Sequence, residues 1–341
     1  MAGPEVTSSE AQGLERVRVL VGVAASFGTG IPVAEAIELL EEGAPGSSEE
    51  LHRWIGRHPG VAREMGGSLV LPGLEWDQEE DSSREALGRR YLDYSRELFA
   101  GPLAPVSRWI ATAATTGSTA FQRPRPGDDL DLFVVVRRGA LWVFLAWSYL
   151  AIRLAPRGKG TEAPPRVCLN LVLDEPSALE EFARPRGLLV AREILSAQVL
   201  LGEAYFRHLV RQASWMRAWL PRKYRRSAEG ESGARESRVP SPLRLLNALL
   251  FPPLAAYLQL VGIWRNHRYR RHREGEGTFR TLTLPGRLQF ASEAFQRLAT
   301  LYQPGTESPR GSAASGHGPA PGPSGPRGRG PSPAPPPGRA G

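Results

Sequence analysis

The feature that most constrains this chain is a glycine-containing turn followed by two aspartates that flank a leucine. Thr116-Gly117-Ser118-Thr119 precedes Asp129-Leu130-Asp131-Leu132, and the apolar residues 133–136 continue the second segment. Side chains alternate along a strand, so Asp129 and Asp131 are expected on one face. Two neighbouring carboxylates repel each other, and a divalent cation between them removes this repulsion. Mg²⁺ commonly binds one or two carboxylates together with substrate phosphates.

The residues before the aspartates suit a phosphate. A turn that contains Gly117 and Ser118 lets backbone N–H groups and a hydroxyl approach a phosphate closely, and Thr119 extends the same segment. The two segments together predict a site for a metal ion and a nucleoside triphosphate (NTP).

These residues resemble the signature of the DNA polymerase β-like nucleotidyltransferase superfamily. Gly117-Ser118 is followed by ten residues and then by the Asp-Leu-Asp-Leu segment that begins at Asp129. The resemblance covers residues 100–220 approximately and implies a small α/β domain with a mixed sheet. It also implies transfer of a nucleoside monophosphate from an NTP to an acceptor group. Asp129 and Asp131 would then be catalytic ligands of Mg²⁺, and Gly117, Ser118 and Thr119 would bind the nucleotide.

The sequence departs from the superfamily pattern at the third carboxylate. Active members usually carry it on the next strand, here expected at residues 166–173, where Asn170 stands at the matching position. An amide is a weaker ligand for Mg²⁺ and cannot take a proton from an acceptor. Asp174 and Glu175 follow, and we favour the interpretation that they cap a helix that starts near Ser177.

Two functions therefore stay open. The first is Mg²⁺-dependent transfer to an unidentified acceptor, with Asn170 in the catalytic set. The second is a catalytically degenerate nucleotide-binding or scaffold protein of the same fold, associated with a membrane surface.

Composition indicates a globular protein of more than one domain. The chain has 341 residues, of which 41% are hydrophobic and 23% charged. Its single cysteine, Cys168, lies in an apolar segment, which favours a buried thiol and a reducing cytoplasm. The N-terminus lacks the pattern of a secretory signal, so we expect a cytoplasmic protein, with peripheral membrane attachment as an alternative.

The expected fold is α+β, a mixed sheet with flanking helices. Strands are predicted at 109–115, 130–136 and 166–173, with a helix at 140–154 between the last two. The predicted parts are a disordered start (1–11), a winged-helix-like domain (12–75), a connecting helix (76–100), the nucleotidyltransferase core with its following helices (101–222), a linker (223–240), a helical segment (241–302) and a disordered tail (303–341).

Two arginine-rich clusters, residues 222–226 and 265–273, contribute to the net charge of +8. Such clusters attract nucleic acid or anionic lipid. Nucleic acid is the less favoured partner, because the third helix of the winged-helix-like domain begins with the acidic pair Glu49-Glu50.

The C-terminal half contains an unusual apolar segment. Residues 245–264 carry no formal charge, and the arginine-rich cluster 265–273 follows directly. Twenty apolar residues would just cross a bilayer, but Asn247, Gln259 and the pair Pro252-Pro253 weaken a membrane span. Three arrangements remain for this segment: packing on the core, which we favour, contact with an anionic membrane surface, or a span.

Overall fold

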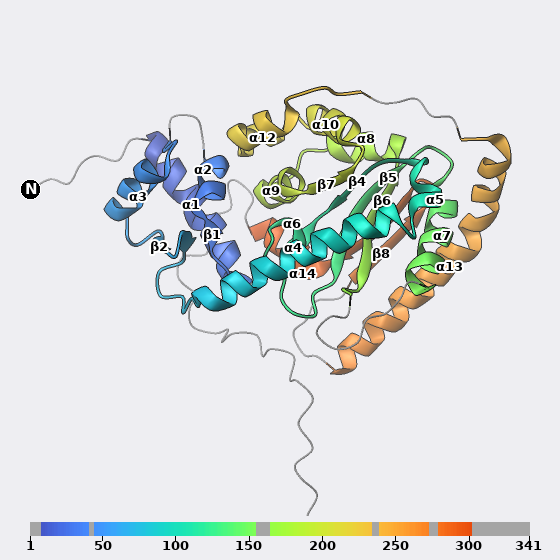
Figure 1. Cartoon of the computed structure of the whole chain (residues 1–341), viewed down its shortest axis with the longest axis horizontal. Coiled ribbons are helices and arrows are strands. Elements are labelled where there is room, and N and C mark those ends of the chain that lie inside the picture. The colour runs from blue at the N-terminus through green and yellow to red at the C-terminus, as the bar shows by residue number, and fades with distance from the viewer. Residues whose placement is uncertain (1–7, 41–43, 155–163, 234–238, 273–278, 302–341) are drawn as a thin grey trace, which may run out of the picture. The chain divides into compact units, whose positions relative to one another are not determined.

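A six-stranded mixed sheet organises the larger part of the chain (Figure 1). The computed structural model describes residues 8–40, 44–154, 164–233, 239–272 and 279–301. The strand order is β7-β4-β5-β6-β9-β8; β5 and β6 are parallel, and the other neighbouring pairs are antiparallel. The strands of this sheet are β4 (Ile110–Thr115), β5 (Leu130–Val136), β6 (Val167–Asp174), β7 (Gln198–Leu201), β8 (Phe279–Leu284) and β9 (Arg287–Ser292). The expectation of an α+β fold with a mixed sheet is confirmed.

Helices cover both faces of this sheet (Figure 1). They are α4 (Gln78–Ala100), α5 (Ala104–Ser107), α6 (Gly117–Ala120), α7 (Leu141–Leu154), α8 (Glu175–Ala183), α9 (Leu188–Ser196), α10 (Glu203–Gln212), α11 (Met216–Trp219), α12 (Pro221–Ala228), α13 (Ser241–His272) and α14 (Glu293–Leu301).

Alternation along β5 divides the core into two layers. Leu132 and Val134 belong to an apolar cluster with residues of α4, α7 and α13. Phe133 and Val135 belong to a second cluster with residues of α8, α9 and α10. Odd-numbered residues of this strand therefore lie on the α8–α10 side of the sheet, and Asp131 belongs to that series.

The crossover from β5 to β6 forms as the sequence predicts. Both strands are rich in Val and Leu, as expected for parallel strands buried on two faces, and α7 connects them. Trp142 and Phe144 of α7 are completely buried, so these aromatic side chains fill the core between the helix and the sheet. Trp147 and Tyr149 on the same helix are partly exposed.

The N-terminal residues form three helices and a small antiparallel sheet with the order β1-β3-β2. Ser47 accepts a hydrogen bond from the N–H of Glu50 and caps the start of the third helix. Gly66 and Gly67 both have positive φ and form the hairpin turn between β2 and β3. The elements of this part are α1 (Ser8–Ser26), β1 (Ile31–Pro32), α2 (Val33–Leu39), α3 (Ser48–Arg57), β2 (Arg63–Met65) and β3 (Ser68–Val70).

Several segments differ from expectation. The range 223–240, expected to be a linker, continues α12 through Ala228, with Lys223 buried. The range 241–302, expected to be helical, contains β8 and β9, which join the sheet at β6. The range 101–222, expected to hold the core strands and then helices, contains a further strand, β7, after α9. In each case a sheet edge or an apolar surface offers contacts that outweigh local propensity.

At the N-terminus, α1 already begins at Ser8, inside the range 1–11 that was expected to be disordered. The remainder of that range, residues 1–7, and the expected disordered tail beyond residue 301 lie outside the described residues.

Candidate functional site

The predicted glycine turn and aspartate pair do meet in the structure. Gly117 opens the short helix α6 with a φ of +64°, and a Cβ built on it would lie 2.6 Å from Oδ2 of Asp131. The N–H of Thr116 donates to the backbone carbonyl of Asp131 at 3.0 Å. The backbone at Gly117 therefore lies directly against the Asp131 carboxylate, an approach that only glycine permits.

A third carboxylate comes from helix α9. Glu193 accepts a hydrogen bond from the backbone N–H of Gly117, and its negative charge acts on Asp131. The sequence analysis missed this residue. The signal that could have revealed it is the charged pair Arg192-Glu193 within the otherwise apolar helix Leu188–Ser196.

Helix α9 is held in place by Arg192, the neighbour of Glu193. The Arg192 side chain is buried, and its Nη2 lies 2.9 Å from Oε1 of Glu35 on α2. Its guanidinium also lies over the ring of Phe121, 4.5 Å from the ring centre. A residue of the N-terminal part thus helps to position the helix that carries Glu193.

On the neighbouring strand, the residue paired with Asp131 is Cys168, whose thiol is hydrogen-bonded to the Asp131 carboxylate. The register then shifts, so that Phe133 pairs with Leu171. Asn170 falls in this irregular stretch and is half-buried. Cys168, and not Asn170, is therefore the residue of β6 that pairs with Asp131, and a catalytic role of Asn170 stays a prediction.

The electrostatics of the site favour a cation. Burial, followed by the negative charges of Glu193 and Asp129, raises the pKa of Asp131 from its ordinary value of 3.8 to about 7. Burial likewise raises the pKa of Glu193 to about 7, against the effect of the Gly117 N–H. Burial, followed by the charges of Asp131 and Asp129, raises the pKa of the Cys168 thiol to about 12, so the thiol stays protonated.

Asp129 lies at the open side of the site. Its side chain is one-third exposed, and Oδ2 lies 3.8 Å from Nη2 of Arg265 on α13. Burial raises the pKa of Asp129, while the charges of Arg265 and Arg166 oppose that shift. The basic end of α13 thus reaches the aspartate pair.

The other residues that the sequence suggested for the site differ in burial and in their contacts. Ser118 is half-buried in α6, beside Gly117, whereas the Thr119 side chain is buried and only 1% exposed. Asp174 caps α8 by accepting from the N–H of Ser177 at 3.0 Å, and Glu175 pairs with Arg137. The favoured interpretation of Asp174 as a cap is confirmed.

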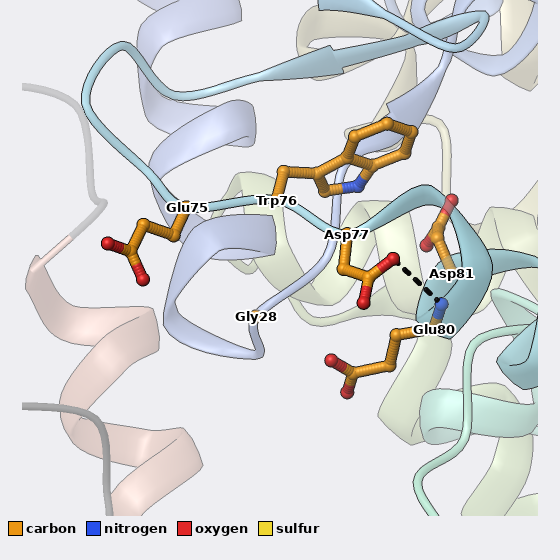
Figure 2. Close-up of a pocket in the computed structure, with 6 residues that line it drawn as sticks. All are labelled: Gly28, Glu75, Trp76, Asp77, Glu80 and Asp81. Carbon is orange, nitrogen blue, oxygen red and sulfur yellow. Dashed lines mark hydrogen bonds between the residues drawn. The ribbon is translucent and has the colours of Figure 1, made fainter.

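A cavity of about 280 Å³ lies elsewhere, at the start of α4 (Figure 2). Two of its acidic side chains have structural partners: Asp77 caps α4 through the N–H groups of Glu79 and Glu80, and Asp81 lies 3.0 Å from Nε of Arg123. Its lining residues are Gly28, Glu75, Trp76, Asp77, Glu80 and Asp81. Neither Asp129 nor Asp131 lines this cavity.

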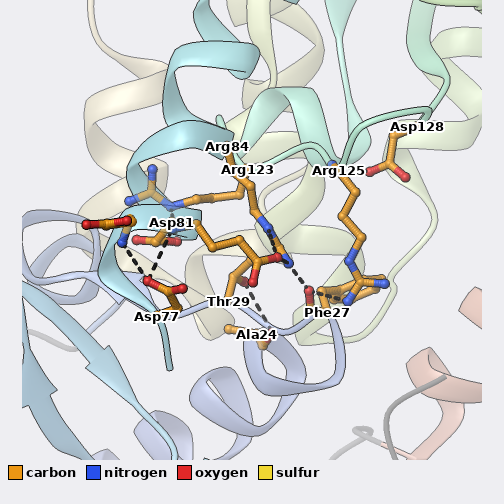
Figure 3. Close-up of polar contacts among 11 residues, drawn as sticks. Ala24, Phe27, Thr29, Asp77, Asp81, Arg84, Arg123, Arg125 and Asp128 are labelled. Atoms are coloured by element: carbon orange, nitrogen blue, oxygen red, sulfur yellow. Dashed lines mark hydrogen bonds and ion pairs between the residues drawn. The ribbon is translucent and has the colours of Figure 1, made fainter. Parts of the chain in front are cut away.

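Arginines next to this cavity fix the loop that leads into β5 (Figure 3). Arg84 and Arg125 both donate to the carbonyl oxygen of Phe27, at 3.0 and 2.6 Å. The N–H of Arg125 also donates to Oδ2 of Asp128 at 2.8 Å. These bonds connect the end of α1 and helix α4 to the residues that immediately precede Asp129.

Among the residues that the structure describes, no three His, Cys, Asp or Glu side chains come together as a ready-made metal site. No family model matches the chain, and neither a curated protein nor a solved structure matches it.

Proposed function

We propose that this chain is a Mg²⁺-dependent nucleotidyltransferase, related to the DNA polymerase β-like superfamily, which transfers a nucleoside monophosphate from an NTP to an acceptor group. The observation that carries the proposal is the contact between Gly117 and the Asp131 carboxylate, at the end of the strand that also places Asp129. The turn that we propose for phosphate binding therefore lies next to the carboxylates that we propose for metal binding.

The donor set fits a magnesium ion that arrives with its nucleotide. Mg²⁺ needs only one or two protein carboxylates when phosphate oxygens and waters complete its shell. Asp129 and Asp131 would supply those two carboxylates. The pKa of Asp131 is raised by burial first and then by the charges of Glu193 and Asp129, and a bound cation would offset these charges. When bound, Mg²⁺ would neutralise the negative charge that develops on the phosphates.

The reaction requires one new bond and one broken bond. An acceptor oxygen or nitrogen attacks the α-phosphorus, and the bond from that phosphorus to pyrophosphate breaks. The acceptor loses a proton, which a base must receive. Gly117 and Ser118 would contact the phosphates, and Asp129 and Asp131 would hold the reacting groups in line.

Glu193 is the group that supports proton transfer in this site. Asn170 cannot take a proton, and the thiol of Cys168 stays protonated at neutral pH. Glu193 has a pKa of about 7, which suits a base that works near neutral pH. We assign to it the role of the third carboxylate.

Glu193→Gln tests this role, because glutamine can still accept the Gly117 N–H but cannot take a proton. Binding of Mg²⁺ and NTP should change little, whereas the transfer rate should fall by about 10²–10⁴-fold. The remaining activity should also lose its rise with pH around 7. Glu203→Gln, at an exposed position of α10, is the matched control. An unchanged rate and pH profile for Glu193→Gln would remove Glu193 from the mechanism.

Gly117→Ala tests the close approach at the turn. The new Cβ would meet Asp131 Oδ2 at 2.6 Å, in a backbone region with a φ of +64°. We expect a loss of about 1–2 kcal/mol from the left-handed backbone and about a tenfold weaker Mg²⁺-dependent NTP binding from displacement of the carboxylate. Calorimetry and chemical denaturation measure the two effects.

Gly67→Ala is the matched control for this variant. Gly67 also has a positive φ, +77°, but a Cβ there would meet no atom within 4 Å. It should lose similar stability and keep full NTP binding. Equal binding by the two variants would show that the contact with Asp131 has no part in the site.

A transfer assay tests the proposed reaction. Each NTP, labelled at its α-phosphate, is incubated with Mg²⁺, a cleared cell extract as the source of acceptors, and either the wild-type protein or Asp129→Asn. The proposal predicts a labelled product with one or more NTPs for the wild type only. Equal labelling by both proteins contradicts it.

One observation favours the second candidate, a nucleotide-binding protein without transfer. The strand neighbour of Asp131 is an uncharged thiol, Cys168, at the place where a carboxylate would assist the aspartates. If Glu193 does not act as the base, the site would bind Mg²⁺ and NTP without releasing pyrophosphate. Retained NTP binding with no labelled product from any NTP would support this function.

We also propose a winged-helix-like assignment for the N-terminal part. The order of α1, α2, α3 and the β2–β3 hairpin supports it. The start of α3 carries Glu49 and Glu50, and its His52 lies 2.9 Å from Glu64 of β2. Acidic groups at this helix oppose a nucleic acid backbone, so contact with the core, as through Glu35, is the role we assign.

A further inference from the structure

Helix α13 has an apolar outer face that the rest of the described structure leaves exposed. Leu249, Leu260 and Ile263 are 64%, 66% and 64% exposed, and Leu245, Tyr257 and Trp264 are also exposed. Residues 245–264 include no Asp, Glu, Lys or Arg on any face of the helix. The outer face of a surface helix in a water-soluble protein is normally polar, so this apolar surface indicates an interaction site.

The helix is long and apolar enough to be a candidate membrane segment. Among the described residues, Ser241–His267 is the segment that meets this criterion, and only 17% of its apolar 18-residue stretch is buried. Helix α7, which contacts α13 (Figure 1), adds the exposed residues Leu150 and Leu154. The low burial of α13 distinguishes it from a core helix of similar composition.

The inner face of α13 argues against insertion across a bilayer. Asn247 accepts the N–H of Trp142 at 2.7 Å, near the start of the helix. Gln259 donates to Thr283 at 3.0 Å in the second half, and Asn266 donates to the carbonyl of Phe279 at 2.7 Å near the end. A spanning helix would have to give up these bonds, whereas a helix lying in the interface keeps all of them.

The charges of α13 identify the chemistry of the partner. The helix carries arginines at both ends, Arg244 before the apolar segment and four more from Arg265 onward, and it has no acidic residue. The aromatic residues Tyr257 and Trp264 belong to types that are enriched at the boundary between lipid and water. A second copy of the chain would bring no acidic groups from this helix to pair with the arginines, whereas anionic headgroups would do so.

We propose that α13 is a membrane-surface helix, which inserts Leu249, Leu260 and Ile263 among the lipids while its arginines bind anionic headgroups. The face that packs on α7 and β8 stays attached to the core. The protein is then bound to the surface of an anionic bilayer without crossing it.

Vesicle flotation of the purified full-length chain tests the proposal. The wild type should float with vesicles of phosphatidylcholine and phosphatidylserine, and float much less with phosphatidylcholine alone or at high salt. The double variant Leu260→Glu/Ile263→Glu should lose about tenfold or more of the bound fraction, because two charges would enter the apolar layer. Its melting temperature should match the wild type, since both side chains are exposed.

Phe27→Glu is the control, because Phe27 is an exposed apolar residue outside α13 and should not affect flotation. Failure of the wild type to float with anionic vesicles would overturn the proposal, as would normal flotation of the double variant. A wild-type dimer that the double variant breaks, together with no flotation, would assign the face to a second copy. Binding that resists carbonate extraction would indicate a span.

Discussion

Replacing Asp131 with asparagine is expected to lower the rate of nucleotidyl transfer on the order of 10³-fold, because a metal ligand worth several kcal/mol in the transition state is lost. The variant should fold, since the two side chains are close in size. A transfer assay at saturating Mg²⁺ and NTP measures the effect. A rate within a few-fold of the wild type would show that Asp131 is not a metal ligand.

The same variant should change the pH dependence of stability in the absence of metal. The pKa of Asp131 is about 7 in the folded state against an ordinary value of 3.8, so its protonated form favours folding. The contribution of the Asp131 carboxyl to the free energy of unfolding is fully present below about pH 4. It is lost as the pH rises to 7, by an amount on the order of a few kcal/mol. The wild type with a chelator should therefore melt lower at pH 8 than at pH 5.

In metal-free Asp131→Asn, the fall in stability between pH 5 and pH 8 should be smaller but not absent, because Glu193 has a similarly raised pKa. Added Mg²⁺ should stabilise the wild type at pH 8 and have little effect on the variant. Glu203→Gln, an exposed acid outside the site, should retain the full decline. An identical decline in wild type and Asp131→Asn would show that the carboxylate is not buried among the acids as described.

The second large effect is expected at Gly202, where α10 begins. Its φ is +67°, and a Cβ would lie 1.9 Å from the backbone carbonyl oxygen of Ala111 on β4. Neither backbone segment can move without breaking the pairing of β7 with β4, so Gly202→Ala should lose about 4 kcal/mol or more of stability. The denaturation midpoint and the soluble yield measure this loss.

Gly56→Ala is the matched control for Gly202→Ala. Gly56 lies in helix α3, its φ is not positive, and a Cβ there would meet nothing within 4 Å. Alanine should raise stability by about 0.5–1 kcal/mol at this position. A Gly202→Ala protein as stable as the wild type would contradict the described contact between the start of α10 and β4.

The centre of the site could be predicted because its signals are local. Alternation puts Asp129 and Asp131 on one face of a strand, and the nearby Gly117 marks a backbone that approaches another group closely. These three residues lie within fifteen positions of one another. The structure brings Gly117 to Asp131, as the pattern indicates.

Residues that come to the site from other elements could not be predicted in the same way. Glu193 depends on the packing of α9, which in turn depends on Arg192 and the distant Glu35. Cys168, rather than Asn170, stands beside Asp131 because β5 and β6 pair in that register, and strand register is a tertiary property. Arg265 reaches Asp129 because α13 packs along the sheet.

The C-terminal strands show a different limit of sequence reasoning. Phe279–Leu284 and Arg287–Ser292 surround the turn residues Pro285-Gly286, which is a recognisable hairpin pattern. The charged and apolar segments before it favoured a helical interpretation of the whole range 241–302. The pairing of β9 with β6 resolves this conflict, because the edge of the central sheet otherwise lacks a partner.

Calorimetric titration of metal-free protein with each NTP, in the presence and absence of Mg²⁺, tests the central claim most directly. The wild type is predicted to bind at least one NTP with Mg²⁺ and to lose that binding when a chelator is added. The double variant Asp129→Asn/Asp131→Asn is predicted not to bind under either condition. Equal binding by the wild type and the double variant, or no binding by either, would contradict the assignment of Asp129 and Asp131 to a Mg²⁺–NTP site.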